Sequence, residues 1–116
     1  MKGWTMDALN YQSIPEMLKV AAVNYRGLPA VSYKRDKKYI TLSYERLYER
    51  VLMAARGLKK TGLEPGAKVA ILSENRTGWV LADLAVQAVR ATTVPIYATN
   101  TVEQVAYVIN HSGCEL

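Results

Sequence analysis

Hydrophobic positions in the second half of the chain predict a strand, a helix and a second strand. Residues 68–73 (KVAILS) and 92–97 (TTVPIY) are short apolar runs, rich in β-branched side chains and bounded by turn-forming residues. Between them, residues 77–90 repeat their apolar positions at helical spacing. Because two parallel strands need a crossover of this kind, we expect a parallel strand pair in an α/β sheet.

The first half of the chain predicts a helix followed by a hairpin. Ser13 and Glu16 have the spacing of a capping box before an apolar helical face, and Gly27 is placed to end that helix. Residues 30–33 and 39–42 have the composition of strands on either side of a charged tip. We therefore expect an N-terminal β-hairpin.

Two further helices are predicted from capping signals. Ser43 is expected to cap the first of them and Gly62 to end it. Thr101 and Gln104 form a second capping-box pattern, with Gly113 at the far end of that helix. The buried stripe of the first helix is expected to be Leu47, Val51, Ala54, Ala55 and Leu58, and that of the second Val102, Val105, Ala106 and Ile109.

The helix predicted over residues 77–90 is apolar almost all round. Its polar residues Asp83, Gln87 and Arg90 share one narrow stripe, so the rest of its surface needs cover on several sides. Residues 114–116 also have the pattern of a further strand. We therefore expect a partial open, mostly parallel sheet with flanking helices plus the hairpin. Residues 1–116 would be part of a larger three-layer domain, with no second domain present.

Length and composition are those of an ordinary globular domain. The chain has 116 residues, of which 50% are hydrophobic and 22% charged, a balance that argues against disorder. No apolar run approaches the roughly 20 residues of a transmembrane helix, and residues 1–4 lack the apolar core of a signal peptide. Its one cysteine, Cys114, allows no internal disulfide, so the expected compartment is the cytoplasm.

The formal net charge of +5 raises the possibility of a nucleic-acid partner. The basic residues cluster at the predicted hairpin tip and at a predicted helix end, where cations interact favourably with the helix dipole. These clusters are Lys34, Arg35, Lys37 and Lys38, and Lys59 and Lys60. We interpret them as solvated structural charge and expect no nucleic-acid partner, a phosphate-binding patch being the alternative.

No catalytic, cofactor-binding or metal-binding residue can be assigned from the sequence. Neither Gly-x-Gly-x-x-Gly nor Gly-x₄-Gly-Lys-Ser/Thr is present. His111 and Cys114 are too few to hold a metal, and His111 is interpreted as a helix-end residue. Residues 73–76 (SENR) follow a predicted strand at the edge where ligands approach α/β sheets. The favoured alternative is that Ser73 or Asn75 caps the next helix.

Several segments occur in an order typical of one enzyme family. They are LSYERL at 42–47, GLEPGAKVAIL at 62–72, SENR at 73–76 with ADLA at 82–85, VPIY at 94–97, and EQVAY at 103–107 with HSG at 111–113. Together they resemble the AMP-forming adenylating enzymes, in particular the long-chain fatty-acid–CoA ligase branch of the acyl-CoA synthetases. Arg90 departs from the family, which usually has glycine before Ala91. Ala98 stands where long-chain members often have proline, and Thr77-Gly78 replaces a common Pro-Glu pair.

The resemblance implies the N-terminal part of the large adenylating domain of a two-step ligase. The whole enzyme would use ATP, Mg²⁺ and coenzyme A, with a fatty acid as substrate, and would be cytoplasmic, its contact with a membrane being left open. The family's phosphate loop, which ends in Pro-Lys-Gly, is absent here. We therefore expect a scaffold that is inactive alone, has the rest of the enzyme as partner and self-associates through exposed apolar surface. The alternative is a standalone α/β interaction or regulatory module without catalysis.

Overall fold

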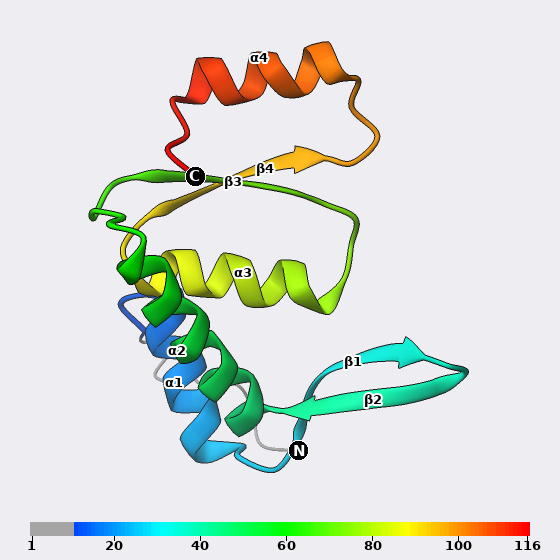
Figure 1. The fold of residues 1–116 in the computed structure, drawn as a ribbon. Helices are drawn as coiled ribbons and strands as arrows, with labels where there is room; N and C mark the ends of the chain where they lie inside the picture. The colour runs from blue at the N-terminus through cyan, green and yellow to red at the C-terminus, as the bar shows by residue number, and fades with distance from the viewer. Residues whose placement is uncertain (1–10) are drawn as a thin grey trace.

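A computed structural model describes residues 11–116, which form helices on both sides of a parallel strand pair, with a separate hairpin (Figure 1). Residues 1–4, for which the sequence predicts the absence of a signal peptide, lie outside the described residues. The elements in chain order are α1 (Ile14–Asn24), β1 (Pro29–Arg35), β2 (Lys38–Ser43), α2 (Tyr44–Lys60), β3 (Lys68–Ser73), α3 (Thr77–Ala88), β4 (Thr92–Tyr97) and α4 (Val102–Ser112).

The predicted N-terminal hairpin is confirmed, and its strands are longer than expected. β1 and β2 pair antiparallel up to Arg35 opposite Lys38. The turn between them consists of Asp36 and Lys37, whose φ angles of 49° and 64° are both in the left-handed region. Two such residues match the twist of the strands that they connect. The cation Lys34 therefore belongs to a paired strand and not to a loose tip.

The predicted parallel strand pair is confirmed as well. β3 and β4 run parallel, with Lys68 opposite Thr92 and Ser73 opposite Tyr97. α3 forms the crossover between them and lies against one face of the pair (Figure 1). The α/β architecture expected from the alternation of strands and helices is therefore present in the chain.

The last residues of the chain join the other edge of β3. The Glu115 N–H donates to the Lys68 carbonyl, and the Ala70 N–H donates to the Leu116 carbonyl, each at 2.8 Å. These bonds have the pattern of the next strand of the sheet, on the edge of β3 that does not face β4. Residues 114–116 were predicted to lead into a strand, and the bonds at 115 and 116 agree with that prediction.

The core lies where α3 meets α2 and the strand pair. α3 also contacts α1 and β1, so the chain's own elements cover it on several sides, where the sequence was interpreted as needing a larger body for this. Of the α3 residues, Ala85 and Val86 are fully buried. The cluster of buried residues that results is Leu18, Leu47, Val51, Ala55, Val69, Ala85, Val86, Val89 and Ala91. Half-buried side chains such as Leu81 and Leu84 pack around this cluster.

The buried face predicted for α4 is wrong. Val102 is 81% exposed and Ile109 40%, Ala106 is exposed, and Val105 is only half-buried. The physical reason is the position of α4, whose main packing partner is β4 and which lies above the strand pair with no second helix beside it in the described chain (Figure 1). An apolar helical stripe predicts what a helix can bury, but a neighbouring element has to cover it.

The predicted N-caps of α1, α2 and α4 are confirmed. The hydroxyls of Ser13, Ser43 and Thr101 each accept the N–H of the residue three positions on, at 3.2 Å. Gln104 completes the second capping box by accepting the Thr101 N–H at 2.9 Å. The box at α1 differs, because the Glu16 carboxylate accepts the N–H of the residue before the cap. Local signals therefore place these three helix starts correctly.

An ion pair holds the start of the hairpin against α2. Arg26 donates from Nε to Glu45 Oε1 at 2.7 Å, and the Arg26 carbonyl accepts the Glu45 N–H at 3.2 Å. The hydrogen bond from Arg26 lowers the pKa of the Glu45 carboxyl, and the charge of Arg26 acts in the same direction. The connection between α1 and β1 is therefore tied to the first turn of α2.

Arg90 occupies a backbone conformation that suits glycine. α3 ends two residues earlier than expected, and Arg90 follows it with a φ of 64°. Its N–H donates to the Gln87 carbonyl at 3.0 Å, and the Ala91 N–H donates to the Val86 carbonyl at 3.1 Å. These two bonds form a Schellman motif, in which glycine is usual at the left-handed position. The motif explains why the resembled family usually has glycine here.

Replacing Arg90 by glycine is expected to raise the free energy of unfolding by about 0.5–1 kcal/mol. The left-handed conformation costs a non-glycine residue about 1–2 kcal/mol, and the greater freedom of glycine in the unfolded chain takes back part of that gain. Urea unfolding followed by circular dichroism measures the change. Arg56→Gly, in the exposed interior of α2, is the matched control and is expected to cost about 1 kcal/mol. If Arg90→Gly also destabilised the protein, the assignment of Arg90 to a left-handed position that favours glycine would be contradicted.

Candidate functional site

The carboxyl ends of β3 and β4 lie at the same edge of the sheet because the strands are parallel. Residues 74–76 connect β3 to α3, and residues 98–101 connect β4 to α4. Ligands of open α/β sheets usually bind outside this edge. The segment 73–76, which the sequence identifies as a possible ligand contact, therefore lies where a site is expected.

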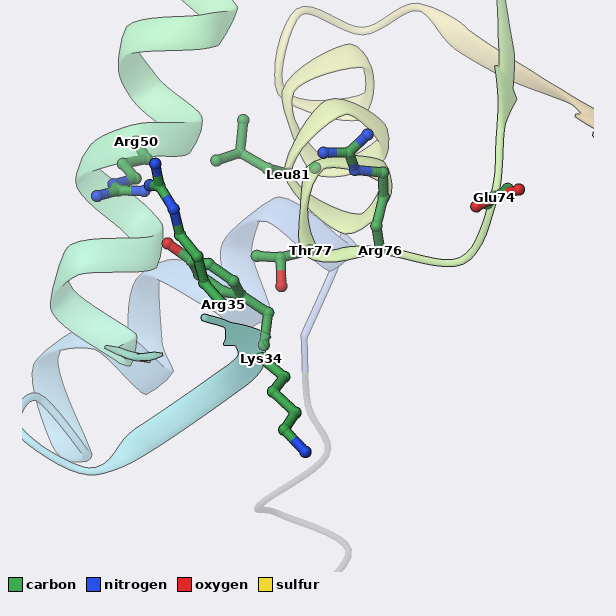
Figure 2. Close-up of a pocket in the computed structure, with 9 residues that line it drawn as sticks. Lys34, Arg35, Arg50, Glu74, Arg76, Thr77 and Leu81 are labelled. Carbon is green, nitrogen blue, oxygen red and sulfur yellow. The ribbon is translucent and has the colours of Figure 1, made fainter. Parts of the chain in front are cut away.

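A hollow of about 630 Å³ lies beside the β3–α3 connection. It is open to solvent and is lined by residues of the hairpin, α2 and the start of α3, as Figure 2 shows. Its lining residues are Tyr33, Lys34, Arg35, Arg50, Glu74, Arg76, Thr77, Gly78 and Leu81. Two residues of the predicted segment, Glu74 and Arg76, thus meet residues that lie far from them in the sequence.

The hollow is strongly basic. Four basic residues line it, Lys34, Arg35, Arg50 and Arg76, together with the carboxylate of Glu74. The Lys34 side chain points away from the other three (Figure 2), and its ammonium lies 5.9 Å from the centroid of the Tyr39 ring, so the hollow's positive charge comes from the three arginines. Ion pairs within residues 11–116 join other residues, Arg26 with Glu45 and Arg46 with Glu49, and none involves these four cations. Glu74 lines the hollow but forms no ion pair with these residues, so the positive charges of the hollow outnumber its carboxylate.

The predicted cap of α3 by Ser73 or Asn75 is wrong. The N-cap residue is Arg76, in an extended conformation, and its side chain makes no capping hydrogen bond. The Ser73 hydroxyl donates instead to the Glu74 carbonyl at 2.9 Å. Because Arg76 is extended, the helix starts only at Thr77, and neither the Ser73 nor the Asn75 side chain bonds to its first N–H groups. The start of α3 is consequently left without a side-chain acceptor or an acidic residue in its first turn.

The described residues contain no group of three His, Cys, Asp or Glu side chains that could hold a metal ion. His111 lies in the last turn of α4, as predicted, and its ring stacks on Tyr107 with centroids 5.4 Å apart. Cys114 is half-buried, with its Sγ 3.0 Å from the Ser112 hydroxyl. Within the described residues, neither side chain belongs to a group of three possible metal ligands.

None of the helices between residues 11 and 116 has the length and apolarity needed to span a membrane.

Comparison with protein families gives a match over most of the chain. The family model described as AMP-binding enzyme matches residues 18–116. The chain is 35% identical over 104 residues to the long-chain-fatty-acid–CoA ligase ACSBG2 of Mus musculus, covering 90% of this chain and 16% of that protein. It is 43% identical over 63 residues to the ligase FadD15 of Mycobacterium bovis, covering 54% of this chain and 10% of that protein. The chain thus spans about a sixth of the first relative's length.

Solved structures show the same fold. The fatty acyl-adenylate ligase of L. pneumophila, in complex with acyl adenylate and pyrophosphate, matches with a TM-score of 0.86 at 20% identity, covering 97% of this chain and 20% of that one. The N-terminal subdomain of Klebsiella oxytoca NpsA, in complex with anthranilyl-AMSN, matches with a TM-score of 0.82 at 19% identity, covering 96% of this chain and 28% of that one. The arrangement of helices and strands is therefore one that adenylate-forming ligases use.

Removing the Ser73 hydroxyl is expected to change the free energy of unfolding by less than about 0.5 kcal/mol, because it does not cap α3. Ser43→Ala is the matched control and is expected to cost about 1 kcal/mol, because that hydroxyl caps α2. Chemical unfolding of both variants measures the difference. An equal loss at the two serines would show that Ser73 is a cap after all.

Proposed function

The chain belongs to the AMP-binding enzyme family, and on that premise we propose that residues 1–116 form the N-terminal part of the large domain of a long-chain fatty-acid–CoA ligase. The observation that carries the proposal is the family match over residues 18–116, which includes most of α1 and every later helix and strand of the chain. The ligase relatives, similar over most of the chain, support the long-chain branch.

The proposed whole enzyme joins a fatty acid to coenzyme A in two steps. A carboxylate oxygen of the acid attacks the α-phosphorus of ATP, giving an acyl-adenylate and pyrophosphate. The thiol of coenzyme A then attacks the acyl carbon, a thioester forms, AMP leaves and the thiol proton goes to solvent. The chain's own share in this reaction is to build and position part of the domain.

The described residues do not fit the groups that this reaction needs. They hold no cluster of carboxylates for Mg²⁺, and the sequence has no glycine-rich phosphate loop. The sites for ATP, Mg²⁺ and coenzyme A are therefore assigned to the rest of the enzyme. We place the enzyme in the cytoplasm, which suits a chain with one cysteine and no disulfide.

The rest of the enzyme is the proposed partner of the face around α4. Large apolar side chains are exposed there, with Val102 at 81%, Tyr97 at 78% and Tyr107 at 66%. Exposed apolar patches of this kind mark surfaces that another part of a protein covers. In the isolated chain, we expect this face to be covered by a second copy of the chain through self-association.

The isolated 116-residue protein is expected to catalyse no fatty-acid-dependent exchange of pyrophosphate into ATP, because it contributes scaffold and no reacting group. Incubation with ATP, labelled pyrophosphate and a long-chain fatty acid measures this, with an intact long-chain fatty-acid–CoA ligase as the positive control. Exchange by the purified chain that is lost on mutation of the chain itself would contradict the scaffold role.

The isolated protein is also expected to self-associate in sedimentation velocity as its concentration rises. The double variant Val102→Lys with Ile109→Lys places two charges on the exposed face of α4 and is expected to shift the protein to monomer. Met53→Lys, at an exposed position of α2, is the control and is expected to leave association unchanged. A strictly monomeric wild-type protein at high concentration would refute the prediction.

A further inference from the structure

We propose that the basic hollow between the hairpin, α2 and the start of α3 binds a phosphate-bearing anion. The guanidinium groups of Arg35, Arg50 and Arg76 would pair with the phosphate, and the first backbone N–H groups of α3 would donate hydrogen bonds to it. This site is distinct from the proposed ligase chemistry and does not depend on it.

The first argument is the convergence of like charges. Arg35 comes from β1, Arg50 from α2 and Arg76 from the start of α3, and Figure 2 shows the Arg35 and Arg50 side chains extending toward each other. No ion pair among the described residues involves any of the three. Like charges held around one hollow repel each other, and a bound anion replaces that repulsion by attraction. The guanidinium fork matches the oxygens of a phosphate in particular.

The second argument is the open start of α3. Thr77 and Gly78 line the hollow, and within residues 11–116 no carbonyl or side chain accepts their backbone N–H groups. Gly78 is exposed and has no side chain of its own, and the Arg76 Nε lies 3.8 Å from where a Gly78 Cβ would stand. A helix start with free N–H groups carries a partial positive charge that favours phosphate. The partial positive charge of the helix start thus adds to the charge of the arginines that line the same hollow.

The third argument concerns the size and walls of the hollow. Its volume of about 630 Å³ is in the range of small-molecule sites and exceeds what one phosphate needs. Tyr33 and Leu81 supply apolar wall for the remainder of a ligand. Glu74 lies on the opposite side of Arg76 from Arg35 and Arg50 (Figure 2), so its carboxylate repels an anion at that rim. The phosphate is therefore placed toward Arg35 and Arg50.

The phosphate could belong to a soluble molecule or to a lipid headgroup, and the two sources share the chemistry that this hollow recognises. Sodium pyrophosphate is the soluble probe, used in calorimetric titration of the 116-residue protein. Phosphatidylcholine vesicles with and without phosphatidic acid are the lipid probe, used in co-sedimentation. Arg50→Gln and Arg76→Gln test the hollow. Lys37→Gln in the hairpin turn and Arg56→Gln on α2 remove the same charge from exposed positions that do not line it.

Arg50→Gln and Arg76→Gln are each expected to weaken binding roughly tenfold, as loss of a charge-assisted hydrogen bond does, and the two controls by less than about twofold. The arginines are exposed, so circular dichroism is expected to show an unchanged fold. In NMR spectra of the wild-type protein, the amide signals of Thr77 and Gly78 are expected to shift on addition of the probe that binds. This readout does not depend on any variant.

Each outcome decides the proposal. Binding of pyrophosphate with the expected pattern of variants identifies a soluble ligand, and binding of phosphatidic acid vesicles alone with that pattern identifies a lipid headgroup. Binding that falls equally in the controls reflects net charge only and overturns the site. Absence of binding to both probes also overturns it.

Discussion

The packing of α3 against three other parts of the chain is the constraint on which the rest of the structure depends. α3 lies between the α1–α2 pair and the β3–β4 pair and also reaches β1 (Figure 1). Its most buried side chains, Ala85 and Val86, are each 1% exposed and small enough to let neighbouring backbones approach closely. Burial of a valine contributes about 1.5–3 kcal/mol, so several such contacts place the hairpin and the sheet relative to each other.

The strand pairings and most helix caps could be predicted from the sequence, whereas the hollow and the exposure of α4 could not. The caps at Ser43 and Thr101 were found because a hydroxyl and its N–H donor are three residues apart. Ser73 was also predicted to cap a helix, but α3 starts after the extended residue Arg76, too far along the chain for the Ser73 hydroxyl to cap it. The hollow needs β1, α2 and α3 in contact, so no single stretch of sequence contains its pattern. The exposure of α4 could not be predicted either, because the apolar stripe of a helix does not indicate which other element covers it.

Membership of the AMP-binding enzyme family and the proposed scaffold role of this chain are compatible. Function depends on sites placed on a fold, and a segment can specify the fold without supplying the site. Here the residues that match the family build most of α1 and every later helix and strand. The arginines of the hollow come from β1, α2 and the start of α3, whereas the exposed apolar side chains lie around α4, which is why the two proposals concern different surfaces.

The proline in β4 has a consequence for how the strand pair can meet other chains. Alternate residues of a strand direct their backbone groups to opposite edges, and the Thr92 N–H donates to the Ala67 carbonyl on the β3 side. Pro95 is three positions on and so faces the outer edge, which no other strand of the described chain pairs with. Proline has no N–H, so this edge lacks a donor that an incoming strand would need. The outer edge is thus protected against amyloid-like strand addition, and contact with other chains is directed to side chains.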